Sequence, residues 1–308
     1  MSMPHARHLL LLLELIALSS CASTRAPGAA DTSPAPAASR RVTLTHLGVA
    51  GWKLESSGGT LLFDPYVTRA AVEDESAPLV PNEAAIAAYT PSMADVVLVG
   101  HSHYDHVLDV PSIARRTGAN VIGSDSTARV AAAGGIPADR IRVVHGGESF
   151  TIGPFAVRVV ASRHSLTGQE NVPIPAGVTL PMAASAYVEG GTLQYLVRSE
   201  GRSIYFVGTA NFIEEEVRAL DARPDVAIVA VGLREKIPNY TCRLLDALGR
   251  PPLVMPNHFD AFREPLRPGE MALDPSTRAN LDAFIAEVGA CAPGTRVEVP
   301  VPLQTIEL

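Results

Sequence analysis

The chain has 308 residues, of which 47% are hydrophobic and 19% are charged, and its formal net charge is -7. This apolar content is typical of a folded protein with a large core and excludes a largely disordered chain. Proteins that bind nucleic acid usually cluster Lys and Arg, so the acidic balance predicts no nucleic-acid partner. The length allows either one large domain or two small ones.

Residues 1–21 have the features of an export signal. Arg7 and His8 precede an apolar run at 9–18, and small residues lead from there to Cys21. The run is shorter than the roughly 20 apolar residues that span a membrane, and it contains an acidic residue. The four residues that end at Cys21 resemble a bacterial lipobox, which implies cleavage before Cys21 and acylation of its thiol. An ordinary cleaved signal peptide with a nearby Cys is the alternative.

Residues 22–41 are rich in Ala, Pro, Ser and Thr and predict a flexible tether, because such a composition buries too little surface to fold. We expect the folded domain at 42–308. This organisation predicts a protein of the bacterial cell envelope, either anchored to the membrane through a lipid or periplasmic. In that oxidising compartment Cys242 and Cys291 can form a disulfide or remain two buried thiols, and their spacing decides nothing.

The domain begins with short β-type runs at 42–47, 52–55 and 60–63, separated by Gly-rich turns that favour an antiparallel meander. Apolar runs then alternate with helical patterns over the rest of the domain. The other predicted strands are 96–99, 120–122, 141–144, 155–161, 193–198, 203–207, 226–231 and 253–255. The predicted helices are 110–116, 126–133, 214–220, 241–248 and 276–288. This order predicts an α/β fold, an αββα four-layer sandwich, although periodicity alone also allows other α/β architectures.

A Pro-rich segment, 168–181, joins the two halves of the domain. Its length and its lack of periodicity are typical of a binding loop or lid, and equally of an ordinary surface loop. The sequence leaves both interpretations open.

A His-rich loop follows the predicted strand at 96–99. Its four potential metal ligands, His101, His103, Asp105 and His106, fall within six residues. A loop at the end of a buried strand can aim several side chains at one point from a rigid base. Imidazole nitrogens together with a carboxylate suit zinc, with iron or manganese as alternatives. The competing interpretation is a polar turn whose His residues only form hydrogen bonds.

Two further histidines, His164 and His258, lie just beyond predicted strands, as the His-rich loop does. We therefore expect both to join the same site. His46 instead lies within the first predicted strand, and His145 precedes a Gly-Gly turn. Core packing or surface hydrogen bonding is the interpretation for these two.

These features together resemble the metallo-β-lactamase superfamily. The residues that carry the resemblance are Gly48, the run 62–65, the His-rich loop, His164 and the pair 257–258. It covers 42–308 and implies the αββα fold. Within the superfamily, the spacing is similar to the branch of ascorbate-phosphate lactonases and N-acylphosphatidylethanolamine-type phospholipases rather than to true β-lactamases.

The resemblance implies two metal positions. One metal is held by the residues that match His101, His103 and His164, and the second by those that match Asp105, His106 and His258. The superfamily also has an Asp that bridges the two metals, in a turn after a strand. In the corresponding run, 205–211, the bridging position falls on Thr209.

The loss of an anionic bridge should weaken the second metal position, because two neighbouring cations are held partly by the anions between them. We therefore expect the site to hold either a single metal or a pair of metals bridged by hydroxide alone. Asn211 is a candidate neutral oxygen ligand in place of the missing carboxylate. Loss of hydrolytic activity is a further expectation that Thr209 allows.

The activity that the resemblance implies is metal-dependent hydrolysis, because zinc lowers the pKa of its bound water to about 7. Asp105 would orient the hydroxide and return a proton to the leaving group. Asp64 either supports the ligands from behind or is only a turn residue before Pro65. The substrate class is an ester, lactone or phosphodiester of a small or lipid-like molecule, since loops rather than the fold decide the substrate.

Two other classes of function remain open. One is an envelope lipoprotein that binds metal or solute without catalysis, which the Thr209 departure favours. The other is an oxidoreductase that uses iron in the same ligand set. Turnover assays distinguish the first from a hydrolase, and metal analysis distinguishes the second.

Overall fold

The computed structural model describes residues 41–168, 170–220, 222–271 and 273–308. The predicted signal segment, nearly all of the tether and Cys21 lie outside these ranges. Within them, no helix combines the length and the apolar character that a membrane span requires.

The first of two seven-stranded sheets has the strand order β14-β1-β2-β3-β4-β5-β6. Its strands β1, β2 and β3 pair antiparallel as the predicted meander, and β3, β4, β5 and β6 pair in parallel. The strands are β1 (Thr43–Gly48), β2 (Gly51–Ser56), β3 (Gly59–Phe63), β4 (Val96–Leu98), β5 (Asn120–Gly123), β6 (Ile141–Val143) and β14 (Thr305–Glu307).

The second sheet has the order β13-β12-β11-β10-β9-β8-β7 and repeats this layout. Strands β7 to β10 pair antiparallel, and β10 to β13 pair in parallel. The strands are β7 (Ser149–Ile152), β8 (Phe155–Ala161), β9 (Leu193–Ser199), β10 (Arg202–Phe206), β11 (Val226–Ala230), β12 (Leu253–Asn257) and β13 (Arg296–Val297).

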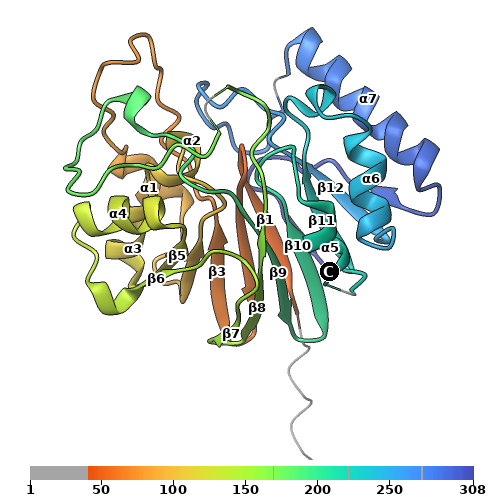
Figure 1. Ribbon diagram of the computed structural model, residues 1–308, viewed down its shortest axis with the longest axis horizontal. Helices are drawn as coiled ribbons and strands as arrows, with labels where there is room; N and C mark the ends of the chain where they lie inside the picture. The colour runs from red at the N-terminus through yellow and green to blue at the C-terminus, as the bar shows by residue number, and fades with distance from the viewer. Residues whose placement is uncertain (1–40, 169, 221, 272) are drawn as a thin grey trace, which may run out of the picture. The chain divides into compact units, whose positions relative to one another are not determined.

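Helices cover the outer faces of both sheets. Figure 1 shows α1, α3 and α4 outside the first sheet and α5, α6 and α7 outside the second, which is the predicted αββα sandwich. The helices are α1 (Glu83–Tyr89), α2 (Tyr104–Val107), α3 (Val110–Thr117), α4 (Asp125–Ala133), α5 (Glu214–Arg218), α6 (Tyr240–Ala247) and α7 (Pro275–Cys291). In the described ranges, connecting segments also contain the short 3-10 helices η1 (Ala138–Arg140), η2 (Ala184–Ala186) and η3 (Arg234–Lys236).

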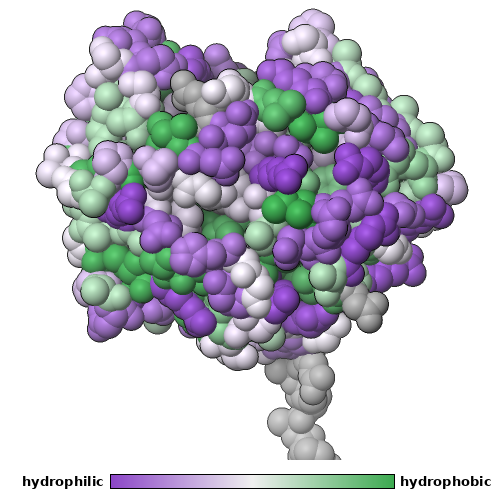
Figure 2. All heavy atoms as spheres, in the orientation of Figure 1, coloured by the Kyte–Doolittle hydropathy of each residue, from purple (hydrophilic) through white to green (hydrophobic). Residues whose placement is uncertain are grey.

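The core has three apolar layers, one between the sheets and one under each set of helices. The layer between the sheets contains Trp52, Phe63, Tyr195 and Phe206, and the rings of Phe63 and Phe206 lie 4.9 Å apart. Burial of each such side chain contributes about 1.5–3 kcal/mol. The visible face in Figure 2 is mostly hydrophilic, and hydrophobic residues lie there in small separate groups.

The two cysteines left open by the sequence are paired in the structure. Cys242 in α6 and Cys291 in α7 form a disulfide with a Cα–Cα distance of 5.5 Å. This bond joins two of the helices that cover the second sheet.

Candidate metal centre

The candidate site lies where several strands of both sheets end. The His-rich loop follows β4, His164 follows β8, Thr209 follows β10 and His258 follows β12. Two groups of three potential ligands meet there, and within each group the ligand atoms lie within 4.8 Å of one another. The first triad is His101, His103 and His164, and the second triad is Asp105, His106 and His258.

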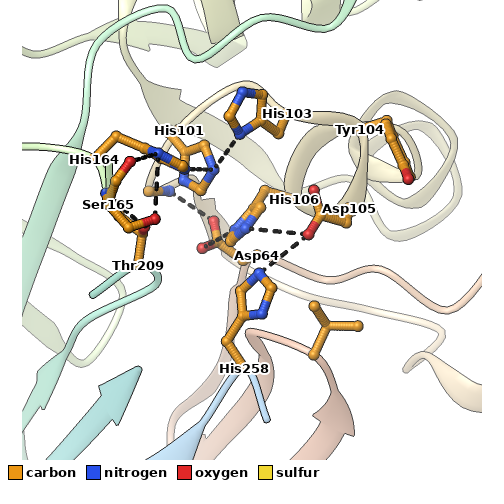
Figure 3. A network of polar contacts seen from close by, with 12 residues as sticks. Asp64, His101, His103, Tyr104, Asp105, His106, His164, Ser165, Thr209 and His258 are labelled. Carbon is orange, nitrogen blue, oxygen red and sulfur yellow. Dashed lines mark hydrogen bonds and ion pairs between the residues drawn. The ribbon is translucent and has the colours of Figure 1, made fainter. Parts of the chain in front are cut away.

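In the first triad three ring nitrogens point toward one another (Figure 3). Nε2 of His101 lies 3.0 Å from Nδ1 of His103 and 3.1 Å from Nε2 of His164. Three nitrogens bound to one zinc at about 2.0–2.1 Å in tetrahedral geometry would lie roughly 3.3 Å apart. The spacing therefore fits three imidazoles around a single metal ion.

The orientation of His164 is fixed by the loop that follows it. Its Nδ1 lies 2.7 Å from the backbone carbonyl oxygen of Ser165, which can only accept a hydrogen bond. Nδ1 therefore carries the proton, and Nε2 presents its lone pair to the first triad.

The second triad lies against the first, since the rings of His101 and His106 are 3.7 Å apart. Oδ2 of Asp105 lies 3.1 Å from Nε2 of His258 and 3.7 Å from Nε2 of His106. In the described part of the chain, that His106 nitrogen is buried and has no hydrogen-bond partner. A buried ring nitrogen without a partner, aimed at a carboxylate and an imidazole, fits a metal ligand.

Asp64 stands directly behind His106. Its Oδ2 lies 2.7 Å from Nδ1 of His106, and its Oδ1 accepts the backbone N–H of Gly100 at 2.6 Å. A Cβ added at Gly208 would lie 2.6 Å from Oδ2 of Asp64, so a glycine is needed where the two segments meet. Asp64 accepts the Nδ1 proton of His106 and leaves Nε2 for a metal, the arrangement that orients many metal-bound imidazoles.

His258 is held in an uncommon backbone conformation with φ of +51°, a region that costs free energy in residues other than Gly. Its N–H donates to the carbonyl of Val49 at 2.8 Å. Two residues later, Asp260 accepts the N–H of Val49 at 2.8 Å and pairs with buried Arg69 at 2.7 Å. These contacts with the β1–β2 turn hold His258 next to the other two residues of the second triad.

The pKa values keep the first triad available to a metal. Burial lowers the pKa of His103 to about 4 and that of His164 to about 3. Burial and the neighbouring histidines also hold the pKa of His101 well below its usual range. All three rings are therefore neutral near pH 7, the form that binds metals.

The second triad has the opposite electrostatic character. Burial opposes ionisation of Asp105, but His106 and His258 outweigh it and hold the pKa of Asp105 below its usual range. Burial likewise opposes charge on His106, yet Asp64 and Asp105 raise the pKa of His106. A proton therefore competes with a metal more strongly at His106 than at the first triad.

Thr209, predicted at the bridging position, does not direct a free oxygen between the triads. Its hydroxyl donates to Oγ of Ser165 at 3.1 Å and accepts the N–H of Ser165 at 3.2 Å. Asn211 donates from its amide to the carbonyl of His164 at 2.8 Å, and its oxygen accepts the N–H of Phe212. Thr209 thus lines the cavity of the two triads with its hydroxyl engaged by Ser165, and Asn211 is not oriented as a substitute ligand.

Both triads open into a cavity of about 690 Å³. Aromatic side chains, among them Tyr104, Tyr187 and Phe262, line it. At its rim Arg263 donates to the hydroxyl of Tyr104 at 3.2 Å and pairs with Glu75 at 3.1 Å. The described part of the Pro-rich segment does not line this cavity, although residues on either side of the segment do.

Sequence reasoning did not single out Ser165, Tyr104, Leu233 or Arg263 as part of this site. Adjacency to His164 and to the His-rich loop would have indicated Ser165 and Tyr104. Leu233 and Arg263 carry no such signal, because only the fold brings their loops to the cavity.

The other two histidines among the described residues, His46 and His145, lie apart from the triads. His46 is fully buried, its ring lies 4.8 Å from that of Trp52, and its Nε2 lies 3.3 Å from the carbonyl oxygen of Val49. His145 is exposed and pairs with Asp125 at 2.8 Å. Core packing accounts for His46, and surface pairing accounts for His145.

An αββα sandwich with two adjacent ligand triads at its strand ends has the architecture of the metallo-β-lactamase superfamily. Residues 60–259 match the family described as "Beta-lactamase superfamily domain", and the chain belongs to this family.

Several known proteins are similar to the chain. The UPF0173 metal-dependent hydrolase of Myxococcus xanthus is 25% identical over 290 residues, which cover 92% of this chain and 91% of that protein. Igni18, a metallo hydrolase from Ignicoccus hospitalis, has a TM-score of 0.57 at 20% identity and covers 87% of this chain and 98% of its own. CmlA, a diiron β-hydroxylase from Streptomyces venezuelae, has a TM-score of 0.56 at 15% identity, over 89% of this chain and 55% of its own. At these identities the solved structures support the fold alone.

Proposed function

We propose that the protein is a metal-dependent hydrolase that cleaves an ester, lactone or phosphodiester with a metal-activated hydroxide, and that its metal is zinc. The observation that carries this proposal is the pair of adjacent ligand triads at the floor of an aromatic-lined cavity. The name of the Myxococcus xanthus relative, a metal-dependent hydrolase, supports the same reaction class.

When bound, zinc lowers the pKa of a coordinated water to about 7 and polarises a substrate oxygen. The residues of the chain supply the remaining steps. Asp105, ionised near pH 7 and close to both His106 and His258, takes up a proton from the attacking water and returns it to the leaving group. The aromatic side chains of the cavity bind apolar parts of the substrate and exclude water.

Zinc is proposed because five imidazoles and one carboxylate form a borderline donor set. Iron and manganese accept the same donors, and CmlA is a diiron enzyme of the same fold. Metal analysis of the purified protein decides among the three.

A second candidate function is a metal-binding or solute-binding envelope lipoprotein with impaired catalysis. Thr209 is the observation that favours it, because its hydroxyl is used by Ser165. The branch of lactonases and phospholipases remains a prediction from spacing.

We also propose an envelope location, through acylated Cys21 or as a periplasmic protein, with no nucleic-acid partner. The Cys242–Cys291 disulfide supports export, because disulfides persist in oxidising compartments.

The experiment is a turnover screen of purified protein, metal-free and zinc-loaded, against chromogenic esters, lactones, phosphodiesters and a cephalosporin. We expect zinc-dependent cleavage in at least one of the first three classes. Asp105→Asn should reduce kcat far more than KM, because it removes both the proton acceptor and the one anionic ligand of the second triad. Zinc-loaded protein that cleaves none of these compounds would favour the binding lipoprotein.

A further inference from the structure

The two triads together contain a single negative side chain. Among their six residues, Asp105 is the one carboxylate and the others are histidines. The histidines bind a metal only as neutral imidazoles, so they contribute no negative charge. Two divalent cations in these adjacent positions would repel each other, and one carboxylate compensates only a small part of their charge.

Among the described residues, no other carboxylate belongs to either triad. Asp64 is close, but both of its oxygens are occupied behind His106, by the ring Nδ1 and by the N–H of Gly100. The segment 208–209 passes from one triad to the other, because Gly208 abuts His106 and Thr209 contacts Ser165 beside His164. Figure 3 shows Thr209 beside Ser165, on the side of the site away from Asp105.

Among the described residues that line the cavity, every Lys or Arg side chain is already paired with a carboxylate. Arg263 is the one Lys or Arg among the described residues that line it, and it pairs with Glu75 at 3.1 Å. Asp260 pairs with Arg69 at 2.7 Å, which leaves Glu235 as the remaining charged side chain outside the triads. An anionic group that enters the cavity is therefore attracted to the metal centre and not to the wall.

We propose that the second triad, Asp105, His106 and His258, holds its metal tightly only together with an anionic oxygen of the ligand. That oxygen enters from the cavity that Thr209 and both triads line, where no further carboxylate of the described chain belongs to either triad. The substrate class is then a compound with an ionised oxygen at the reacting group or next to it, a phosphodiester or a carboxylate. This inference rests on the proposed function, because it names the substrate class of the same site.

The test measures zinc binding and does not depend on turnover. Equilibrium dialysis of metal-free protein against buffered zinc gives the affinities of the first and second ion. Dimethyl phosphate represents a phosphodiester, acetate represents a carboxylate, and trimethyl phosphate is the uncharged control. We expect one or both anions to tighten the second zinc by about 10-fold or more, and trimethyl phosphate to leave it unchanged.

Two variants at one position provide matched controls. Thr209→Asp supplies a carboxylate beside the triads, so its second zinc should bind tightly without added anion, and the anion effect should fall below about 2-fold. The Asn side chain of Thr209→Asn has nearly the shape of the Asp in the first variant but no charge. This variant should therefore keep the anion dependence of wild type. The first zinc, bound by the other triad, reports that each variant is folded.

The zinc-binding results distinguish between support for the proposal and its failure. An effect of acetate alone identifies a carboxylate ligand, and an effect of dimethyl phosphate alone identifies a phosphodiester; either supports the proposal. A second zinc that binds equally tightly without any anion overturns it, because hydroxide would then be a sufficient bridge. A second zinc that binds under none of these conditions overturns it as well. The proposed hydrolysis fails independently, when zinc-loaded protein shows the anion effect but cleaves no substrate.

Discussion

Oδ2 of Asp64 lies 2.7 Å from Nδ1 of His106, and both side chains are fully buried. This contact fixes which nitrogen of His106 faces the second triad. Asp64→Asn keeps the shape but removes the charge and offers the ring a weaker acceptor. We expect zinc to bind the second triad about 10–100-fold more weakly in this variant.

Competition with a chelator measures that affinity. Asp225→Asn is the control, because Asp225 accepts hydrogen bonds from Ser203 in a strand pair and lies outside both triads. Unchanged zinc affinity in Asp64→Asn would show that Asp64 does not position His106.

The Cys242–Cys291 disulfide closes a loop with a sequence separation of 49 residues. Its removal should enlarge the unfolded ensemble, and the loop-entropy model gives a loss of about 4 kcal/mol, within a typical range of about 2–4 kcal/mol. Urea unfolding of the Cys242→Ser/Cys291→Ser double variant measures the loss. Wild type treated with reductant should have the same free energy of unfolding as the double variant. Reductant should not change the free energy of unfolding of the double variant. A double variant as stable as oxidised wild type would mean that the bond contributes nothing.

The lowered pKa of His46 predicts that the folded protein loses stability in mild acid. Burial lowers the pKa of His46 from 6.5 to about 4, so the unfolded chain binds a proton at this residue before the folded protein does. Stability that is present above pH 6.5 is therefore lost as the pH falls toward 4. Between about pH 7.5 and about pH 5 the loss from this residue is about 2 kcal/mol.

His46→Phe, which keeps a ring against Trp52, should lack that part of the loss. Urea titrations of metal-free wild type and variant at both pH values measure it, since the other histidines contribute equally to both proteins. Identical pH dependence in the two proteins would contradict the assignment.

Cys21 lies outside the described residues, and its acylation remains a prediction from the preceding sequence. Mass spectrometry of the mature protein should find Cys21 as an acylated first residue. Cys21→Ser should move the protein from the membrane fraction to the soluble fraction. A mature protein that begins beyond Cys21 without lipid would rule the anchor out.

Much of the fold follows from local patterns. The apolar runs and helix periodicities reproduce nearly every long element, because strands and amphipathic helices differ in their repeat. The edge strands β13 and β14 have only two and three residues, too few for a repeat to appear. Helix α1 begins at an Asn82 cap but buries a single apolar residue, Ile86, so its pattern is weak.

The grouping of the six candidate metal ligands was predictable because the His-rich loop concentrates four of them within six positions, and the other two follow strands. The contacts that orient them were not. The pairing of Arg69 with Asp260, 191 positions apart, holds the His258 loop, and the hydroxyl contact of Thr209 with Ser165 spans 44 positions. Such pairs depend on how the two halves of the sandwich pack, which local periodicity does not encode.

The metal content of the protein shows whether the two triads form a metal centre. Elemental analysis of protein purified without added metal should find about one equivalent or more of zinc, or of iron or manganese if one of these is the native metal. His103→Ala removes one nitrogen of the first triad and should lower that content, whereas His145→Ala, at an exposed histidine outside both triads, should not. Wild-type protein that contains no metal and takes up none from buffered zinc would show that the two triads are not a metal centre.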